Sequence, residues 1–289
     1  MDLTAFAEEV GPEGPVTITG LGTRGGPVAG VRGVRAPSGV DWVEPAEMTV
    51  CCGAGTPVAE LDEALLAGGQ SVAIPPSGTV GGALALGRSG IRRLGHGPVR
   101  DTVLQARYVS AAGDVVKAGG PTVKNVSGFD LCRLLVGARG TLGFIGDVIL
   151  RTRPRARVEQ WFAGSVAPGE VMARLYRPVS VLWDGATTWV LLEGDERDTA
   201  EQVAPLALDA VAGPPALPSG GRWSIPAGAY ADLRGEFVVE IGVGIVHHRD
   251  VAPRPAVDPA VAELHRRIKA NFDPAGRLNP GVDVLDVLD

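Results

Sequence analysis

The glycine-rich stretch TITGLGTRGG, residues 17–26, constrains the possible folds more than any other part of the sequence. It contains Gly20-x-Gly22-x-x-Gly25, the spacing of a dinucleotide-binding loop, after a β-branched stretch that is typical of a strand. In a Rossmann domain a helix follows such a loop at once, because the helix N-terminus binds the pyrophosphate. The next residues, GPVAG, show no helical periodicity, and no βαβ unit leads to the acidic Asp41 downstream. The sequence therefore disfavours a Rossmann domain and leaves a plain turn or an anion-binding loop.

A second glycine-rich stretch, SGTVGGALALGRSG at residues 77–90, favours the anion-binding alternative. Successive backbone N–H groups in tight glycine turns form a nest around an anion, and the missing Cβ lets the backbone approach phosphates closely. Two loops of this kind can enclose one pyrophosphate between them. The pair therefore predicts a nucleotide site made of two loops without helices.

Composition argues against several classes of function. The 289 residues, 45% of them hydrophobic, suffice for one large domain or two smaller ones. The formal net charge of -6 and the lack of a basic stripe argue against nucleic acid as a partner. The cysteines Cys51, Cys52 and Cys132 form no CxxC motif, so they predict no iron–sulfur cluster and fit a reducing cytoplasm. No apolar run reaches the ~18 residues of a transmembrane segment, and the acidic N-terminus does not resemble a signal peptide.

The first half of the chain has the hydrophobic pattern of a mixed α+β domain. Thr56-Pro57 opens a helix with proline in its first turn, and Ser127-x-x-Asp130 has the capping-box spacing before another helix. Residues 72–90 are interpreted as a loop-rich region. Strands are expected at residues 16–20, 48–52, 103–110, 114–117 and 144–151.

The second half changes to a β-α-β-β-α-β order, the split βαβ arrangement of ferredoxin-like domains. A last helix is expected to begin at Asp258-Pro259, because aspartate is a good N-cap and proline a good first-turn residue. Val261, Leu264 and Ile268 mark the face of this helix that we expect to be buried. The elements expected before it are a strand at 158–164, a helix at 168–176, strands at 179–184 and 188–193, a helix at 196–210 and a strand at 237–246.

Four segments carry a resemblance to a known family: GLGTRGG, Pro75–Leu104, Val123–Pro154 and FDPAGRLNPG, in this order across nearly the whole chain. They are similar to segments of flavoproteins of the vanillyl-alcohol-oxidase type, which share the FAD-binding domain of p-cresol methylhydroxylase. Within that superfamily they are most similar to FAD-binding subunits of glycolate oxidase. The resemblance implies an α+β fold, in which a two-subdomain FAD-binding domain carries a small ferredoxin-like cap. The implied boundaries are 1–157 for the FAD-binding domain, 158–250 for the cap and 251–289 for a segment that returns to the first domain.

The same resemblance implies roles for individual residues. The two glycine loops would bind the pyrophosphate of FAD, and the second loop would also pass beside the flavin ring. Arg100 and Asp101 would hold that loop beside the cofactor, or form only a structural ion pair. The implied FAD-binding residues are Gly20, Gly22, Thr23, Arg24, Gly25, Gly78, Thr79, Val80, Gly81, Gly82, Ser89, Gly90, Arg100, Asp101, Gly140, Thr141, Gly143, Ile145 and Asn279.

The histidines limit the chemistry that the chain offers. Covalent flavin attachment in this superfamily uses a histidine or cysteine at the loops; the first loop has neither and His96 is the only nearby candidate, so we expect non-covalent FAD. Oxidation of a 2-hydroxy acid needs a cation for the carboxylate and a base for the hydroxyl proton. His265 is expected at the surface, while His247-His248 ends a strand and supplies either a base or only two polar residues. His247 is our catalytic candidate, and no third ligand at suitable spacing predicts a metal site.

Three functions remain open at this point. The first is an FAD-dependent oxidoreductase that acts alone on a small 2-hydroxy acid or a related alcohol. The second, which the resemblance favours, is a flavin-bearing subunit of a complex with a sister flavoprotein and an iron–sulfur partner, cytoplasmic or membrane-associated through those partners. The third is a non-catalytic FAD-binding subunit for electron transfer or assembly. A degenerate binding module that has lost FAD is disfavoured by the intact glycine loops. The small, histidine-poor cap and the lack of cluster-ligating cysteines favour the second function.

Overall fold

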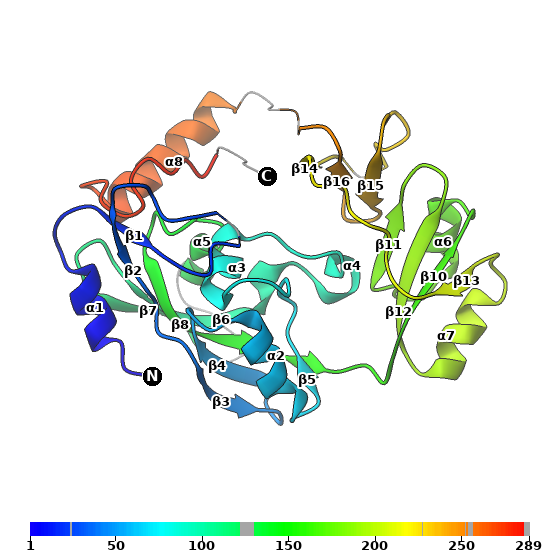
Figure 1. Cartoon of the computed structure of the whole chain (residues 1–289), viewed down its shortest axis with the longest axis horizontal. Coiled ribbons are helices and arrows are strands. Elements are labelled where there is room, and N and C mark those ends of the chain that lie inside the picture. The colour runs from blue at the N-terminus through cyan, green and yellow to red at the C-terminus, as the bar shows by residue number, and fades with distance from the viewer. Residues whose placement is uncertain (24, 122–129, 227, 252, 254–256, 286–289) are drawn as a thin grey trace. The chain divides into compact units, whose positions relative to one another are not determined.

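The computed structural model describes residues 1–23, 25–121, 130–226, 228–251, 253 and 257–285, and the chain forms two compact units (Figure 1). Unit 1 comprises Met1–Gly90, Pro98–Arg155 and the C-terminal part of the chain, Val257–Leu285. The described part of unit 2 comprises Ile91–Gly97, Ala156–Val251 and Pro253. Each unit has its own sheet and its own hydrophobic core.

An antiparallel sheet of five strands, in the order β3-β4-β8-β6-β7, forms the centre of unit 1. The strands are Val40–Glu44 (β3), Thr49–Gly53 (β4), Val103–Val109 (β6), Val115–Gly119 (β7) and Phe144–Arg151 (β8). The strands expected at 48–52, 103–110, 114–117 and 144–151 are confirmed to within two residues. The edge strand β3 was not expected, because most of its side chains are exposed and it has no apolar run.

Three helices pack against this sheet and complete the main core of unit 1: α2 (Val58–Leu66), α3 (Val80–Leu86) and α5 (Leu131–Leu135). Leu61 and Leu65 of α2 are fully buried against the strands, as the apolar spacing of that segment requires. Asp130 caps α5, since its Oδ1 accepts a hydrogen bond from the N–H of Arg133 at 3.1 Å. Ser127, the other half of the expected capping box, lies outside the described residues. A two-stranded ladder, Gln70–Ser71 (β5) with Arg153–Pro154 (β9), lies beside α2.

The N-terminal strands and the C-terminal tail lie side by side in unit 1 (Figure 1). Strand β1 (Val16–Ile18) pairs in parallel with β2 (Arg32–Val34), and Val16 forms a parallel bridge with Leu278. The buried Arg277 guanidinium donates hydrogen bonds to four backbone carbonyls, those of Val10, Glu13, Gly14 and Ala111. Helix α1 (Thr4–Val10) adds Phe6 and Val10 to the small core beneath these strands. The tail is therefore an integral part of unit 1.

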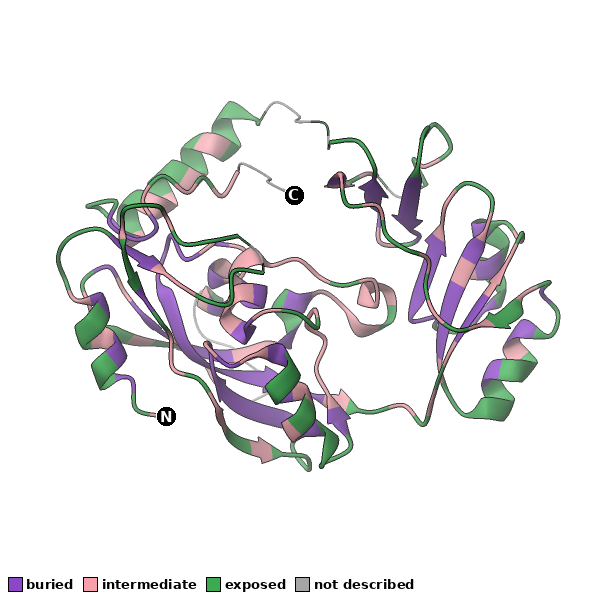
Figure 2. Ribbon diagram, viewed as in Figure 1, coloured by how far each residue is buried: buried purple, intermediate pink, exposed green. Residues whose placement is uncertain are grey.

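Helix α8 (Pro259–Phe272) begins as expected, with Oδ1 of Asp258 accepting from the N–H of Ala260. The expectation that its whole apolar face is buried is wrong. The side chains of Val261 and Leu264 are 43% and 54% exposed, and only Ile268 and Phe272 pack against the core of unit 1. Figure 2 shows this change along the helix, whose first turns are largely exposed. Apolar spacing defines a helix face, but it does not fix how far along the helix a partner surface reaches.

Unit 2 contains a seven-stranded sheet in the order β13-β10-β12-β11-β15-β16-β14. The strands are Val158–Gly164 (β10), Ser180–Trp183 (β11), Thr188–Gly194 (β12), Asp209–Val211 (β13), Gly221–Ser224 (β14), Phe237–Glu240 (β15) and Ile245–His248 (β16). Helices α6 (Pro168–Arg174) and α7 (Glu196–Val203) cover one face and enclose Val171, Val190 and Val203. The order β13-β10-β12-β11, with a helix after β10 and after β12, is the ferredoxin-like arrangement.

Two elements of this unit differ from their predicted extents. The helix expected at 196–210 ends at Val203, because Pro205 lacks the N–H that a helix needs and disfavours helical geometry at Ala204. The chain then returns as β13, which is the fourth strand of the ferredoxin-like order. The strand expected at 237–246 is a hairpin of β15 and β16, because Gly242 and Gly244 adopt positive φ between two apolar halves.

The segment Ile91–Gly97, with helix α4 (Arg93–His96), packs within unit 2, although the sequence joins it to the second glycine-rich stretch. Gly95 donates to the carbonyl of Val179 at 3.1 Å, and a Cβ at Gly95 would lie 2.7 Å from the Val179 Cα. Arg92 forms ion pairs with Glu159 and Glu193. These contacts fix the segment to strands β10, β11 and β12. Among the described residues, no helix has the length and hydropathy needed to cross a membrane.

Candidate functional site

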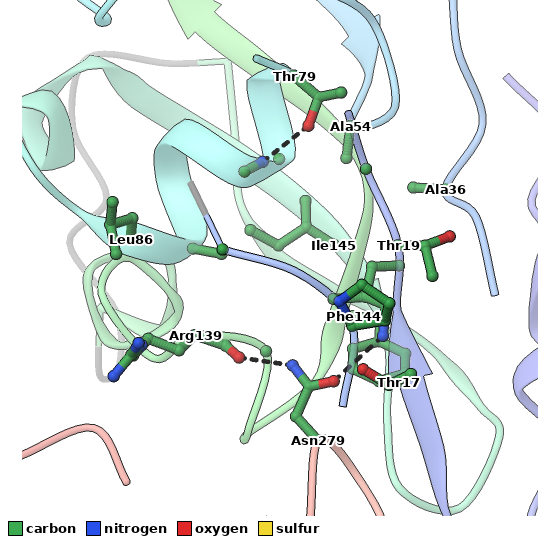
Figure 3. A pocket seen from close by; sticks show the side chains of 18 of the residues that line it. Thr17, Thr19, Ala36, Ala54, Thr79, Leu86, Arg139, Phe144, Ile145 and Asn279 are labelled. Atoms are coloured by element: carbon green, nitrogen blue, oxygen red, sulfur yellow. Dashed lines mark hydrogen bonds between the residues drawn. The ribbon is translucent and has the colours of Figure 1, made fainter. Parts of the chain in front are cut away.

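One cavity of unit 1 brings both glycine-rich stretches together (Figure 3). The first stretch forms one wall, and the start of α3 forms another. The turn before β8 and the amide of Asn279 complete the lining. Of the sequence-predicted residues, those that line the cavity are Gly20, Gly22, Thr23, Gly25, Thr79, Gly81, Gly82, Gly140, Gly143, Ile145 and Asn279.

The described residues of the first glycine stretch form no helix, as the sequence predicts. It runs from β1 to β2 through bends and isolated bridges, and Gly22 and Gly25 adopt φ of 72° and 103°. A Cβ built on Gly22, Gly25 or Gly26 would meet no atom within 4 Å, so this backbone opens onto the cavity. Within the described residues, no chain atom accepts a hydrogen bond from the N–H of Gly20, Leu21 or Gly22. These donors suit an anionic ligand.

The second glycine stretch is helical, and the expectation of a loop without a helix is wrong here. Thr79 caps α3 by accepting from the N–H of Gly82 at 3.1 Å. The N–H of Val80 donates to the Thr56 carbonyl and that of Gly81 to the Ala54 carbonyl. The stretch therefore uses these three donors for its own fold. Adjacent glycines lower helix propensity, so the local sequence does not predict this helix. Its hydrogen bonds to Thr56 and Ala54 stabilise it instead.

Gly81 shows why this helix needs glycine. A Cβ at Gly81 would lie 2.9 Å from both the Cβ and the carbonyl oxygen of Ala54. The helix therefore approaches the end of β4 more closely than any side chain allows. Gly87, with φ of 69°, ends the helix in the left-handed conformation typical of a C-cap. Both glycines serve the packing of α3 and so place its N-terminus at the cavity.

Several sequence-predicted residues do not line the cavity. Val80 is buried in the core of unit 1, and Thr141 donates its hydroxyl to the Ala138 carbonyl at 2.7 Å. Gly78 accepts from the N–H of Val58, and Ser89 Oγ accepts from the N–H of Val99 at 3.0 Å. Gly90 also lies away from it, and Arg24 is outside the described residues.

Arg100 and Asp101 lie in the short helix Val99–Thr102 (η1), away from the cavity. Their side chains are exposed, with Arg100 Nε 3.8 Å from Asp101 Oδ1. Asp101 also pairs with Arg133 at 3.1 Å. Exposed pairs of this kind contribute only about 0–1 kcal/mol, so we read them as surface ion pairs.

Asn279 holds the cavity together from the C-terminal tail. Its Oδ1 accepts from the N–H of Ile18 at 3.1 Å, and its Nδ2 donates to the carbonyl of Arg139 at 2.7 Å (Figure 3). A Cβ at Gly140 would lie 2.6 Å from that Nδ2. The amide thus joins strand β1 to the turn that precedes β8. Its role in the chain itself is to fix two walls of the cavity.

Sequence reasoning missed part of the lining. Thr17 accepts from the N–H of Val28 at 3.1 Å and Thr19 donates to the Val34 carbonyl at 3.0 Å, so both brace the first glycine stretch. Their alternation in TIT, just before the glycines, is the signal that could have found them. Phe144 and Arg139 sit beside predicted residues, but no motif singles them out. The other lining residues that were not predicted are Ile18, Leu21, Gly26, Pro27, Val28, Ala36, Ala54, Gly55, Ala85, Leu86, Leu135 and Val282.

The charge of the cavity wall fits an anionic, partly apolar ligand. No carboxylate lies among the described lining residues, and Arg139 is the one charged side chain among them. Ile18, Leu86 and Phe144 supply apolar surface. Unengaged N–H groups, open glycine backbone and apolar walls together meet the needs of a dinucleotide such as FAD.

A second polar group lies in the sheet of unit 2. His247 Nε2 is 2.8 Å from Oε1 of Glu240, which is only 2% exposed, and Arg222 Nη2 lies 3.8 Å from the same oxygen. His248 has both ring nitrogens engaged, by the carbonyl of Arg234 and the N–H of Asp250. His248 is therefore a structural residue, and His247 is the one of the pair whose surroundings suit chemistry.

The two other histidines lie elsewhere. His96 Nε2 is 2.9 Å from Oε2 of Glu193, and it belongs to the segment that packs within unit 2. His265 is half-buried on α8. The structure therefore gives neither a place in the wall of the cavity.

A curated relative decides the family. The glycolate oxidase subunit GlcE of Escherichia coli is 30% identical to this chain, over 92% of each protein. The chain belongs to the FAD-linked oxidase family. The family's FAD binding domain matches residues 17–119, and the C-terminal domain of FAD linked oxidases matches residues 228–282. The similarity to the vanillyl-alcohol-oxidase type found in the sequence is thereby confirmed, with FAD as the cofactor and an FAD-dependent oxidoreductase as the class.

Other relatives of this FAD-linked oxidase match over shorter stretches. D-lactate dehydrogenase of Archaeoglobus fulgidus is 40% identical, over 37% of this chain and 25% of its own. Glycolate oxidase subunit GlcD of Bacillus subtilis is 38% identical, over 28% of this chain and 17% of its own. Among solved structures, alkyldihydroxyacetonephosphate synthase aligns with a TM-score of 0.65 at 15% identity, over 96% of this chain and 73% of that one. That likeness confirms the α+β fold class.

Proposed function

We propose that this FAD-linked oxidase is the FAD-binding subunit of a complex that oxidises a small 2-hydroxy acid, with FAD held non-covalently in the unit 1 cavity. The observation that carries the proposal is the meeting of both glycine stretches at one cavity whose described lining contains no carboxylate. The first stretch would donate its unengaged N–H groups to the phosphates, and the start of α3 supplies a close-packed wall. In this proposal unit 1 binds the cofactor and unit 2 forms the cap, so the segment Ile91–Gly97 belongs to the cap and not to the FAD-binding domain.

The chain's own residues would hold and orient the reactants. Gly20, Gly22 and Gly25 would face the diphosphate, and Phe144 and Ile145 would pack against the rings. When bound, FAD supplies the oxidant that takes a hydride from the carbinol carbon. His247 is the proposed acceptor of the hydroxyl proton, supported by its buried hydrogen bond to Glu240.

The proposed partners are a sister flavoprotein and an iron–sulfur subunit. Support comes from the name of the relative, a subunit of glycolate oxidase, and from the cysteines of this chain. Burial raises the pKa of the Cys51 thiol to about 11 and that of Cys52 to about 12, so neither is poised to ligate a cluster. Electrons would therefore leave through a partner. Such a complex would be cytoplasmic, or associated with the membrane through its partners.

The visible spectrum of the purified chain tests this proposal. We expect a yellow protein that takes up FAD and whose flavin stays oxidised with glycolate or D-lactate until the partner chains are added. A flavin that bleaches in the chain alone supports the second candidate, a stand-alone oxidoreductase. A flavin that no hydroxy acid reduces, even with partners, supports a non-catalytic electron-transfer or assembly subunit. A chain that takes up no FAD contradicts all three.

A further inference from the structure

Arg139 brings a positive charge to the wall of the unit 1 cavity. It is the one charged side chain among the described lining residues, and it is half-buried. Ala85, Leu86 and Leu135 line the same cavity and offer apolar side chains. Because a partly apolar wall screens charge less than open water does, a negatively charged ligand group is attracted more strongly here than at an exposed arginine.

Two backbone hydrogen bonds hold Arg139 at the cavity. Its N–H donates to the carbonyl of Ala85, near the end of α3, at 2.8 Å, and its own carbonyl accepts from Nδ2 of Asn279 at 2.7 Å. In Figure 3 this carbonyl points toward Asn279, while the side chain extends away from that amide. The main chain is therefore fixed to α3 on one side and to the tail on the other, so the guanidinium starts from a defined position.

The backbone conformation of Arg139 is unfavourable for an arginine. Its φ is 51°, in the left-handed region, where a Cβ comes too close to the following carbonyl oxygen. Glycine has no such penalty, as the next residue, Gly140, shows with a φ of 70°. Of the four described non-glycine residues with positive φ, Arg139 and Asn279 both line this cavity. Strained residues gather at ligand sites, so an arginine at a position that suits glycine indicates a role for its side chain.

The guanidinium of Arg139 also contacts the C-terminal tail. Its Nη1 donates to the carbonyl oxygen of Asp283 at 3.0 Å, next to Val282, which lines the cavity. A guanidinium carries several N–H donors in a planar fork, so one side chain can bind a chain carbonyl and an anion together. The fork matches phosphate oxygens in particular, because parallel N–H groups can bind two of them at once. In oxidised FAD the diphosphate is the part that carries negative charge.

We propose that the guanidinium of Arg139 binds the diphosphate of FAD. This role rests on the proposed function, which leaves Arg139 unassigned. The backbone N–H groups of Gly20, Leu21 and Gly22 supply hydrogen bonds to the phosphates, and Arg139 adds a full positive charge that offsets part of their negative charge. All of these donors belong to unit 1.

The variant Arg139→Gly in the full chain separates cofactor binding from folding. Glycine removes the guanidinium but also relieves the left-handed strain, so we expect the urea midpoint of the FAD-free protein to be no lower than that of wild type. The Kd for FAD, measured in a flavin fluorescence titration, should rise about 10- to 100-fold, because a hydrogen bond to a charged group is lost. The dependence of this Kd on salt should weaken, since less positive charge faces the phosphates.

The matched control is Arg177→Gly. Arg177 has nearly the same φ, 50°, but it is exposed, belongs to unit 2 and is not among the lining residues of the cavity. The same substitution therefore relieves the same kind of strain and removes the same charge at another place. We expect its Kd for FAD to stay within about twofold of wild type at each salt concentration.

Three results would overturn the inference while wild type still binds FAD. The first is an R139G Kd within about twofold of wild type, and a lowered flavin reduction potential in that case would mean that Arg139 faces the flavin ring instead. The second is a raised Kd with unchanged salt dependence, which means contact with an uncharged part of FAD. The third is a raised Kd with a lowered urea midpoint, which means a structural role. If the wild-type chain itself binds no FAD, the proposed function fails and the role of Arg139 with it.

Discussion

Asp273 shows how a single buried carboxylate secures the C-terminal tail. Its side chain is fully buried and accepts hydrogen bonds from Lys269 Nζ and from the N–H groups of Arg277 and Leu278. Burial opposes ionisation, but these three donors outweigh it and hold the pKa of Asp273 below its ordinary value of 3.8. The carboxylate thereby positions Arg277 and Leu278, the residues through which the tail joins β1.

The depressed pKa of Asp273 predicts a pH dependence. A carboxyl group whose pKa is lower in the folded state stabilises fully above its ordinary value of 3.8, and that stability is lost as the pH falls through the folded pKa. We expect Asp273→Asn to lower the free energy of unfolding by about 2–3 kcal/mol at pH 7, because the amide cannot replace the ionised acceptor. The difference from wild type should narrow only below pH 3.8. Urea unfolding at several pH values measures this.

The control for Asp273→Asn is Asp114→Asn, which changes an exposed carboxylate in the same unit. It should leave the unfolding free energy within about 0.5 kcal/mol of wild type. A gap between wild type and Asp273→Asn that already closes between pH 7 and pH 5 would show that another group is responsible.

At the scale of elements, the sequence predicts those helix ends and strands that depend only on nearby side chains. The caps Asp130 and Asp258 and the strands of the β6–β7 hairpin follow from side-chain types and spacing alone. Helix α3 does not, because its glycines lower helix propensity and its N-terminus depends on the carbonyls of Thr56 and Ala54. Residues 237–246 predict a single strand because both halves are apolar, whereas the structure has the β15–β16 hairpin.

The sequence predicts some residues of the candidate site and not others, as it does for the helices and strands. The sequence identifies the glycine stretches because glycine is favoured where the backbone needs a positive φ, as at Gly22 and Gly25. The positions of Ser89 and Arg100 outside the lining depend on where the chain turns after α3. The hydrogen bonds of Asn279 to Ile18 and Arg139 join segments that are far apart in the sequence, so no local pattern predicts them.

Two glycines of the cavity, one in the closely packed helix α3 and one in the open first stretch, are predicted to differ in how much stability an alanine costs. Gly81→Ala should lower the free energy of unfolding by about 1–3 kcal/mol, because its Cβ would lie 2.9 Å from Ala54. Gly26→Ala should leave stability of the FAD-free protein within about 0.5 kcal/mol, because its Cβ meets no atom within 4 Å and its φ is not left-handed. Urea unfolding without FAD compares the two.

The same variants test the site of the cofactor. Since Gly26 lines the cavity, its new methyl group should weaken FAD binding about tenfold, or about 1.4 kcal/mol, in a flavin titration. Unchanged FAD affinity in Gly26→Ala would mean that the cofactor binds elsewhere. A Gly81→Ala variant as stable as wild type would contradict the close packing of α3 against Ala54.

At the scale of the whole molecule, the chain consists of two units with separate cores, and the candidate cofactor cavity belongs entirely to unit 1. A ligand stabilises the folded state that binds it by mass action, about 2.7 kcal/mol at 100 times its Kd. FAD bound in this cavity therefore acts first on unit 1. The tryptophans allow the units to be observed separately, because Trp42 lies in unit 1 and Trp161, Trp183, Trp189 and Trp223 in unit 2.

This distribution predicts that added FAD raises the thermal midpoint followed by far-UV circular dichroism, which reports the backbone of both units, more than the midpoint followed by tryptophan fluorescence, which comes mainly from unit 2. A Trp42→Phe variant makes the fluorescence report on unit 2 alone and serves as the control. Equal shifts by both probes would mean that the cofactor stabilises both units directly.

The bonds between the tail and the N-terminal strands have a consequence for synthesis on the ribosome. Arg277, Leu278 and Asn279 complete unit 1 by bonding residues near its beginning, such as Val10, Val16 and Ile18. The described part of unit 2 is translated before them. Unit 2 can therefore fold on the ribosome before unit 1 receives these three residues. A chain that ends just before Arg277 would lack the hydrogen bonds that join the tail to the N-terminal strands of unit 1.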